Sequence, residues 1–263
     1  MNNSPRLRHP SLSLREGTGV SYNRCMKQLL LAYDQGFEHG PVDFDETNVD
    51  PQSIIDIANK SQVFTGIILQ EGLAEKYKTD IPMILKLNGK TRLHPDEDPY
   101  SPQLCTVAKA IELGAKSVGY TIFVGSEHEA KMMQEFSIIE DEAHKNNLGV
   151  IAWMYPRGKS VKGQETSKDI VAYAARLGLE LGADYVKVPY TGDVASFSWV
   201  IKSAGKTGVL AQGGVIIEEG SLLKEAQEIM QSGAMGMAVG RNIWQSADPI
   251  GLSKKLANVI FKS

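Results

Sequence analysis

The chain has 263 residues, of which 42% are hydrophobic, and its formal net charge is −3 at pH 7. This length and apolar content suit a single α/β barrel, and the slightly acidic balance indicates no nucleic acid or other polyanion as a partner. No run of about 18 uninterrupted apolar residues predicts a membrane span. Two cysteines are too few for a disulfide framework, which is typical of a protein of the reducing cytoplasm.

Short apolar or β-branched runs alternate along the chain with longer helical patterns. We expect strands at 28–33, 66–69, 83–87, 117–122, 149–154, 185–188, 208–211 and 236–239. Helices are expected between them at 51–62, 72–77, 102–113, 127–146, 167–181, 195–204, 220–231 and 249–261. Eight strand-then-helix units over this length predict a closed (β/α)₈ TIM barrel, which fits better than an open doubly wound sheet.

Several of the expected helices finish with glycine just before a strand, at 113–116, 181–184 and 232–235. Glycine at these places fits the left-handed C-cap position. The repeated pattern favours one architectural unit, so we expect a single barrel domain at 27–263. Residues 1–26 lack a strong pattern and are interpreted as an N-terminal arm or extra helix under the barrel. Residues 92–102, rich in proline and acids, predict a surface excursion after the third strand.

One apolar strand contains a lysine. Lys187 lies in the run Asp-Tyr-Val-Lys-Val-Pro-Tyr at 184–190. An ammonium at the end of a buried strand loses its hydration, so the pKa of the amine falls toward neutrality. A neutral amine in a pocket is a nucleophile that forms Schiff bases with carbonyl substrates. Alternatively, the side chain reaches the barrel rim or pairs with an acid.

In a (β/α)₈ barrel, reactive groups lie at the carboxyl ends of the strands and in the loops that follow. Asp34 follows the first strand, where it either orients an amine or handles a proton, or else caps a helix or braces the loop. Glu38 and His39 are interpreted as loop-bracing residues. Lys86 is a second lysine in an apolar strand. If it points inward near Lys187, repulsion lowers the pKa of one amine, and if it points outward it is solvated.

The fifth strand carries Trp153 and Tyr155, which share one face because they are two residues apart. If that face points inward, the indole forms a wall and the phenol reaches the reacting carbon. Otherwise both side chains fill the core. Arg157 follows in the loop, where its guanidinium could clamp an anion.

The seventh and eighth strands end in glycines. Gly213 and Gly214 follow one, and Gly240 with Arg241 follows the other. Loops after these strands commonly hold phosphate in such barrels, because glycine lets backbone N–H groups approach the anion. We therefore expect a phosphate site here rather than plain turns. The five histidines show no metal-ligand spacing, so neither a metal nor another cofactor is predicted.

Six segments together resemble the archaeal-type class I fructose-1,6-bisphosphate aldolases. They are AYDQGFEHGP at 32–41, LKLNGK at 85–90, SVGYT at 117–121, WMYPRG at 153–158, YTGD at 190–193 and AVGRNIWQ at 238–245. The similarity runs from about residue 29 to about residue 256. The resemblance implies a metal-independent (β/α)₈ barrel, a phosphorylated sugar as substrate, and a homo-oligomeric ring, commonly of ten subunits.

Roles of single residues follow from the same resemblance. The family's imine-forming lysine matches Lys187, its proton-transferring tyrosine Tyr155, its strand-one aspartate Asp34, its active-site tryptophan Trp153 and its strand-five arginine Arg157. Its phosphate-binding backbone matches Gly213, Gly214, Gly240 and Arg241. Two positions depart from the pattern: Gln35 stands where the family often has histidine, and Gln212 where it often has serine.

The implied reaction is the reversible cleavage of fructose 1,6-bisphosphate to dihydroxyacetone phosphate and glyceraldehyde 3-phosphate. Two related lysine-dependent reactions stay open, those of the transaldol-type 2-amino-3,7-dideoxy-heptulosonate synthase and of the thiolase acting on phosphorylated autoinducer. The loop at 38–40 and Trp153 favour the aldolase. A non-catalytic phosphosugar-binding barrel is the third alternative, but it would have no reason to keep Lys187, Tyr155 and Asp34 together.

Overall fold

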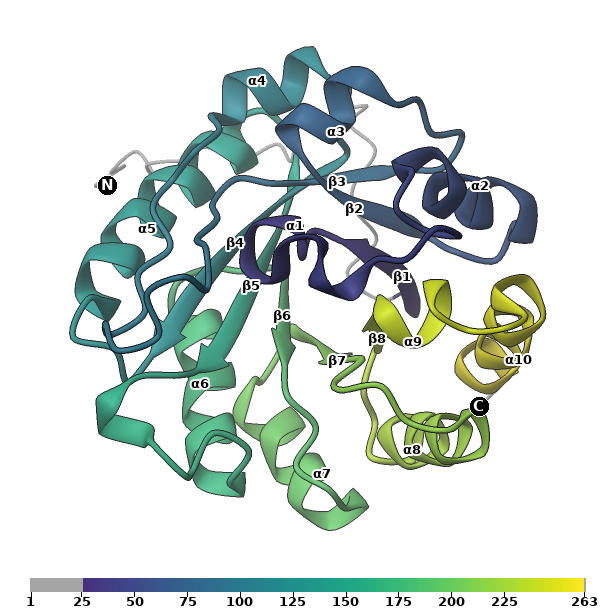
Figure 1. Ribbon diagram of the computed structural model, residues 1–263. Coiled ribbons are helices and arrows are strands. Elements are labelled where there is room, and N and C mark those ends of the chain that lie inside the picture. The colour runs from purple at the N-terminus through teal and green to yellow at the C-terminus, as the bar shows by residue number, and fades with distance from the viewer. Residues whose placement is uncertain (1–25, 263) are drawn as a thin grey trace, which may run out of the picture.

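A computed structural model describes residues 26–262 of the chain. Eight parallel strands pair in sequence order and close into a barrel (Figure 1). The strands are β1 (Gln28–Tyr33), β2 (Gly66–Gln70), β3 (Met83–Lys86), β4 (Ser117–Val124), β5 (Gly149–Pro156), β6 (Tyr185–Val188), β7 (Gly208–Gln212) and β8 (Gly236–Val239). The predicted (β/α)₈ barrel is confirmed, and every strand begins at the residue expected from the sequence.

Helices surround the barrel on its outside (Figure 1). The α-helices are α1 (Gly36–His39), α2 (Pro51–Ser61), α3 (Glu71–Lys76), α4 (Val107–Glu112), α5 (Glu129–Lys145), α6 (Lys168–Glu180), α7 (Val194–Ser203), α8 (Glu219–Gln231), α9 (Arg241–Trp244) and α10 (Pro249–Lys262). Two short 3-10 helices are η1 (Gly40–Asp43) and η2 (Lys159–Val161). The short elements α1, η1, η2 and α9 lie in the loops after β1, β5 and β8, and local apolar periodicity did not predict them.

The core has two layers, one inside the barrel and one between the strands and the helices. Every residue of β1, β4 and β5 is buried, as expected for parallel strands covered on both faces. Helices contribute apolar stripes to the outer layer, for example Ile54, Ile55 and Ala58 of α2. The large interior side chains include Trp153 and Tyr185, both at most 1% exposed.

The segment between β3 and α4 differs from the expectation. The predicted helix at 102–113 is wrong at its start, because α4 begins only at Val107, where Thr106 caps it by accepting a hydrogen bond from the backbone N–H of Lys109. The residues before it pair instead with the strand end: Leu104 and Cys105 both donate to the Leu87 carbonyl. The predicted surface excursion is likewise only partly exposed, since Asp98 is buried and accepts from the backbone N–H groups of Glu127 and Lys159.

The remaining expectations concern the N-terminal segment, the cysteines, membrane-spanning helices and metal sites. The N-terminal arm predicted at 1–26 lies, apart from Met26, outside the described residues, as does Cys25. Cys105 is a free, buried thiol. In residues 26–262 no helix is long and apolar enough to span a membrane. The same residues contain no cluster of three or more metal-ligating side chains.

Candidate active site

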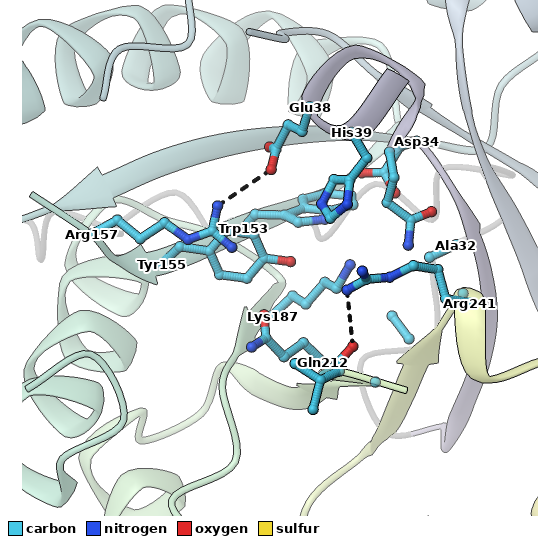
Figure 2. A pocket seen from close by; sticks show the side chains of 16 residues that line it. Ala32, Asp34, Glu38, His39, Trp153, Tyr155, Arg157, Lys187, Gln212 and Arg241 are labelled. Atoms are coloured by element: carbon cyan, nitrogen blue, oxygen red, sulfur yellow. Dashed lines mark hydrogen bonds and ion pairs between the residues drawn. The ribbon is translucent and has the colours of Figure 1, made fainter. Parts of the chain in front are cut away.

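A cavity opens among the carboxyl ends of the strands. Its walls come from β1, β5, β6, β7 and β8 and from the loops that follow β1, β5, β7 and β8 (Figure 2). Every site residue predicted from the sequence lines it except Lys86. The lining residues that the following paragraphs use are Asp34, Gln35, Glu38, His39, Trp153, Tyr155, Arg157, Lys187, Gln212, Gly213, Gly214, Gly240 and Arg241.

Lys187 lies on β6 and projects its amine into this cavity (Figure 2). The residue is 6% exposed, and within residues 26–262 its amine has neither a hydrogen bond nor an ion pair. Burial lowers the pKa of Lys187 below its ordinary value, Asp34 and Glu38 oppose this, and the cations Lys86 and Arg157 lower it further. The alternative in which this lysine pairs with an acid or reaches the rim does not describe the structure.

Trp153 forms the inner wall beside that amine. Lys187 Nζ lies 5.3 Å from the centre of the indole ring. The ring lies across β4 at Gly119, where a Cβ atom would fall 2.0 Å from the ring carbon Cζ3. Glycine at this position therefore makes room for the indole, which reaches from β5 across β4 toward β3. The indole Nε1 is buried and has no acceptor among the described residues.

Lys86, the last residue of β3, is not among the residues that line the cavity. Its amine is buried, donates to the Asn88 carbonyl over 3.2 Å, and lies 5.4 Å from the centre of the Trp153 ring. Of the two directions that the sequence left open for Lys86, the structure shows the inward one, into the barrel. Burial lowers the pKa of Lys86, although Asp34 and Glu38 raise it. The indole accordingly has two lysine amines near it, one from β3 and one from β6.

Tyr155 and Asp34 complete the group around the amine. Tyr155 is 8% exposed, and its ring centre lies 5.9 Å from Lys187 Nζ. Burial and the nearby Asp34 carboxylate raise the pKa of Tyr155 well above its ordinary value, so the phenol keeps its proton at neutral pH. A neutral phenol beside an amine can donate a proton to an atom bound there.

Arg157 and Glu38 form an ion pair at one side of the mouth. Arg157 Nη1 donates to Glu38 Oε2 over 3.3 Å, and the guanidinium lies 5.2 Å from the Tyr155 ring centre (Figure 2). Burial alone would raise the pKa of Glu38, but Arg157, Lys86 and His39 lower it below its ordinary value. Glu38 is therefore ionised and holds Arg157 at the edge of the cavity.

The opposite side carries Gly213, Gly214, Gly240 and Arg241, which we call the glycine cradle. Gly214 has a φ of +61°, the left-handed region that favours glycine. The N–H of Gly213 donates to the Ala238 carbonyl over 2.9 Å, so this amide is occupied within the fold. Gly240 permits a close approach, because a Cβ there would lie 2.6 Å from Gln35 Nε2.

One side chain of α9 holds the loop of the cradle in place. Asn242 Nδ2 donates to the carbonyls of Gly213 and Val215 over 2.7 and 2.8 Å, and Asn242 Oδ1 accepts from the N–H of Ile217. Arg241 Nη2 donates to the Gly214 carbonyl over 3.3 Å (Figure 2). The shape of the cradle is therefore fixed by two neighbouring residues that follow β8.

The structure also brings in residues to which no site role was assigned from the sequence. Glu38 and His39 do brace the loop after β1, but both also line the cavity. Gln35 and Gln212, the two departures from the family pattern, line it too, and Gln35 Oε1 is buried without a partner in the described part of the chain. The available signal was that Gln35 follows β1 and that Gln212 is the last residue of β7, since such positions face the active end of a barrel.

A family model described as DeoC/LacD family aldolase matches residues 28–246. The chain belongs to this aldolase family. The class 1 fructose-bisphosphate aldolase of Thermoproteus tenax is 46% identical over 244 residues, covering 91% of this chain and 92% of the relative. That of Halobacterium salinarum is 38% identical over 246 residues, with the same two shares.

Solved structures agree with the sequence relatives. An archaeal fructose 1,6-bisphosphate aldolase matches with a TM-score of 0.87 at 44% identity, over 92% of this chain and 97% of that one. A second archaeal aldolase, with its catalytic lysine covalently bound to the carbinolamine intermediate of the substrate, matches with a TM-score of 0.86 at 45% identity, over 92% and 96%. The resemblance noted in the sequence is confirmed.

Proposed function

We propose that this protein is a class I, metal-independent fructose-bisphosphate aldolase, which reversibly cleaves fructose 1,6-bisphosphate to dihydroxyacetone phosphate and glyceraldehyde 3-phosphate. One observation carries the proposal: a buried lysine amine of lowered pKa, on β6, faces a cavity that also contains a protonated phenol. The names of the relatives supply the substrate.

The first half of the reaction uses Lys187. The neutral amine attacks the ketone carbon C2 of the sugar, and the resulting carbinolamine loses water to give an iminium ion. This cation accepts the electron pair of the C3–C4 bond when the C4 hydroxyl gives its proton to Asp34, directly or through a water. Glyceraldehyde 3-phosphate departs and an enamine stays on Lys187. Burial of the amine supports this sequence because it lowers the pKa of Lys187 and so favours the neutral, nucleophilic form.

The second half uses Tyr155. Its phenol, protonated because burial raises its pKa, delivers a proton to C3 of the enamine, directly or through a water. Water then adds to the iminium carbon, and dihydroxyacetone phosphate leaves with the amine restored. Asp34 holds the amine and the sugar hydroxyls, and Trp153 shapes the ketose site and excludes water. Each of these roles is part of the proposal.

The cavity has an arginine on each of two opposite sides, an arrangement that suits a substrate with two phosphates. The glycine cradle with Arg241 is the candidate for one phosphate, and Arg157 for the other. Because Gly213 N–H is already bonded to Ala238, we assign the backbone contribution of the cradle to Gly214 and Gly240. Arg157 is bonded to Glu38 over 3.3 Å, so a phosphate at that end would compete with a carboxylate for the guanidinium.

The proposal is tested by measuring fructose 1,6-bisphosphate cleavage with a dehydrogenase that consumes one product. We expect turnover that persists in excess EDTA, because the iminium ion takes the place of a metal as electron acceptor. Replacement of the substrate by fructose 1-phosphate, which lacks one phosphate, should raise KM. An enzyme that lost its activity with EDTA and regained it with a divalent cation would contradict the mechanism.

A second candidate function shares the same intermediate. A relative from Methanocaldococcus jannaschii, 39% identical over 251 residues, is named a fructose-bisphosphate aldolase/6-deoxy-5-ketofructose 1-phosphate synthase. The enamine on Lys187 could pass its three-carbon unit to an acceptor other than glyceraldehyde 3-phosphate, as in the transaldol-type synthases. Cleavage in the presence of a second aldehyde distinguishes the two: transfer gives a new sugar phosphate, whereas the simple aldolase gives only the two triose phosphates.

Location and assembly belong to the same proposal. We place the enzyme in the cytoplasm and expect a homo-oligomeric ring. Two exposed aromatic residues on neighbouring helices, Tyr173 of α6 and Trp199 of α7, are 59% and 51% exposed and support a contact between copies. Light scattering coupled to gel filtration tests the assembly, and a monomer of 28.7 kDa would contradict it.

A further inference from the structure

The loop after β1 and the segment after β8 meet at one carboxylate. Asp43, the last residue of η1, lies with its Oδ2 atom 2.7 Å from His39 Nδ1 and 3.7 Å from Arg241 Nη1. The three side chains are between 17% and 22% exposed, so water screens these contacts only in part. Arg241 and His39 both line the cavity, whereas Asp43 lies behind them.

In the described part of the chain neither Asp43 Oδ2 nor His39 Nδ1 has a well-formed hydrogen bond, so the contacts of the Asp43 carboxylate with His39 and Arg241 are electrostatic. Arg241 has polar neighbours on two sides. Asp43 lies next to Nη1, and Nη2 donates to the Gly214 carbonyl. The remaining Nε is buried and has no acceptor in the described part of the chain. Each of the two Nη atoms carries two N–H groups, and the contacts with Asp43 and Gly214 use only one on each. The guanidinium therefore keeps donors for a ligand anion in the glycine cradle while its position is restrained.

Asp43 is also anchored through its main chain. Gln245, the residue after α9, donates a hydrogen bond from its Nε2 atom to the Asp43 carbonyl. Phe44, the next residue, packs on Trp244 of α9 with the ring centres 5.5 Å apart, so apolar packing already joins the end of this loop to α9. The polar contacts with Arg241 and Gln245 add to this packing and place the Asp43 carboxylate beside the side-chain cation of the cradle.

We propose that Asp43 is a positioning residue of the glycine cradle, which holds Arg241 and His39 against the same side of the cavity so that the guanidinium meets a substrate phosphate already oriented. The inference rests on the proposed function, since it concerns the phosphate of that substrate. A carboxylate near an anion site is repulsive by itself. Asp43 therefore strengthens phosphate binding only if the free energy gained by orienting Arg241 exceeds the free energy lost to repulsion between the carboxylate and the phosphate.

Two substitutions distinguish the positioning of Arg241 by Asp43 from the effect of losing one negative charge. Asp43→Asn removes the carboxylate, and Glu46→Gln removes the same charge from an exposed residue three positions further along as the matched control. Titration calorimetry of the full chain with inorganic phosphate should show affinity weakened about tenfold by Asp43→Asn, and unchanged by Glu46→Gln. If Asp43 only opposed the anion, Asp43→Asn would bind phosphate more tightly, and that result, or no change, would overturn the proposal.

Borohydride trapping distinguishes a role of Asp43 in phosphate binding from a purely structural role. With dihydroxyacetone phosphate, the concentration needed for half-maximal trapping should rise about tenfold in Asp43→Asn, whereas with dihydroxyacetone, which lacks the phosphate, it should not change. Equal losses with both ketones would refute a role at the phosphate.

A double mutant tests whether Asp43 acts through Arg241. In an Arg241→Ala background, Asp43→Asn should weaken phosphate binding no further, because its target is gone. An undiminished effect in that background would overturn the positioning role. If the wild-type chain traps neither ketone, the aldolase proposal fails by itself, and phosphate calorimetry still decides the role of Asp43.

Discussion

The charge of Lys86 should set the pH at which Lys187 becomes reactive. Lys86 points into the barrel without lining the cavity, and its amine lies near the same Trp153 ring as the amine of Lys187. Replacing it by methionine keeps an unbranched side chain of similar length and removes the cation. Because a neighbouring cation favours the neutral form of Lys187, its loss should raise the pKa of the Lys187 amine.

The size of this effect follows from the geometry. The two Nζ atoms lie 5.4 and 5.3 Å from the centre of one ring, so they are at most about 11 Å apart. Two unit charges at that separation repel by about 1.5 kcal/mol at an effective dielectric constant of 20. Such an energy changes the ratio of neutral to charged Lys187 about tenfold.

The assay is the rate of imine trapping as a function of pH. A lowered pKa means that the neutral amine is populated as pH rises through that value. Lys86→Met should therefore trap about tenfold more slowly than wild type near neutral pH, and should reach the wild-type rate at high pH. Lys86→Arg, which keeps the charge, should retain the wild-type profile, as should Lys116→Met, which removes an exposed charge at the other end of the barrel.

Two outcomes would refute this reasoning. A rate lowered by the same factor at every pH would show that Lys86 acts by packing rather than by charge. A profile unchanged in Lys86→Met would show that Lys86 is itself uncharged over the working range, so that Asp34, Glu38, Arg157 and burial alone set the reactivity of Lys187.

Three further substitutions test other parts of the site. Tyr155→Phe should slow turnover by about 10²–10⁴-fold while a borohydride-trapped adduct still forms, and full activity would remove the tyrosine from its role. Gly119→Ala should displace Trp153 and destabilise the fold by about 1–3 kcal/mol, measured by urea unfolding with tryptophan fluorescence, and an unchanged emission spectrum would contradict the contact. Asn88→Ala should cost about 3 kcal/mol or more, because it leaves buried partners such as the Thr121 N–H unbonded, and a loss under 1 kcal/mol would contradict this account.

The barrel was predictable because its signals are local. Each strand contains an apolar run that is buried on both faces, and the starting residues of all eight could be read from the sequence. The rule that reactive groups follow the strands then selected Asp34, Tyr155 and Lys187. The direction of Lys86 could not be predicted, because a one-residue change of register would have turned it outward.

The remaining contacts join residues far apart in the chain. Arg157 and Glu38 are 119 positions apart, and nothing in the sequence near either one specifies the other. The same holds for Asp43 with Arg241, and for Gly119, whose missing side chain matters only because an indole from the next strand occupies the space. The start of α4 was missed for a related reason: the backbone before Val107 bonds to Leu87 instead of continuing the helix.

The most direct test of the account is to identify the residue that bonds to the sugar. The chain is incubated with fructose 1,6-bisphosphate, reduced with borohydride, digested, and mapped by mass spectrometry. We expect one adduct, carried by the peptide that contains Lys187 and absent from Lys187→Met. An adduct on Lys86 or on a surface lysine, or turnover without any adduct, would contradict the central claim.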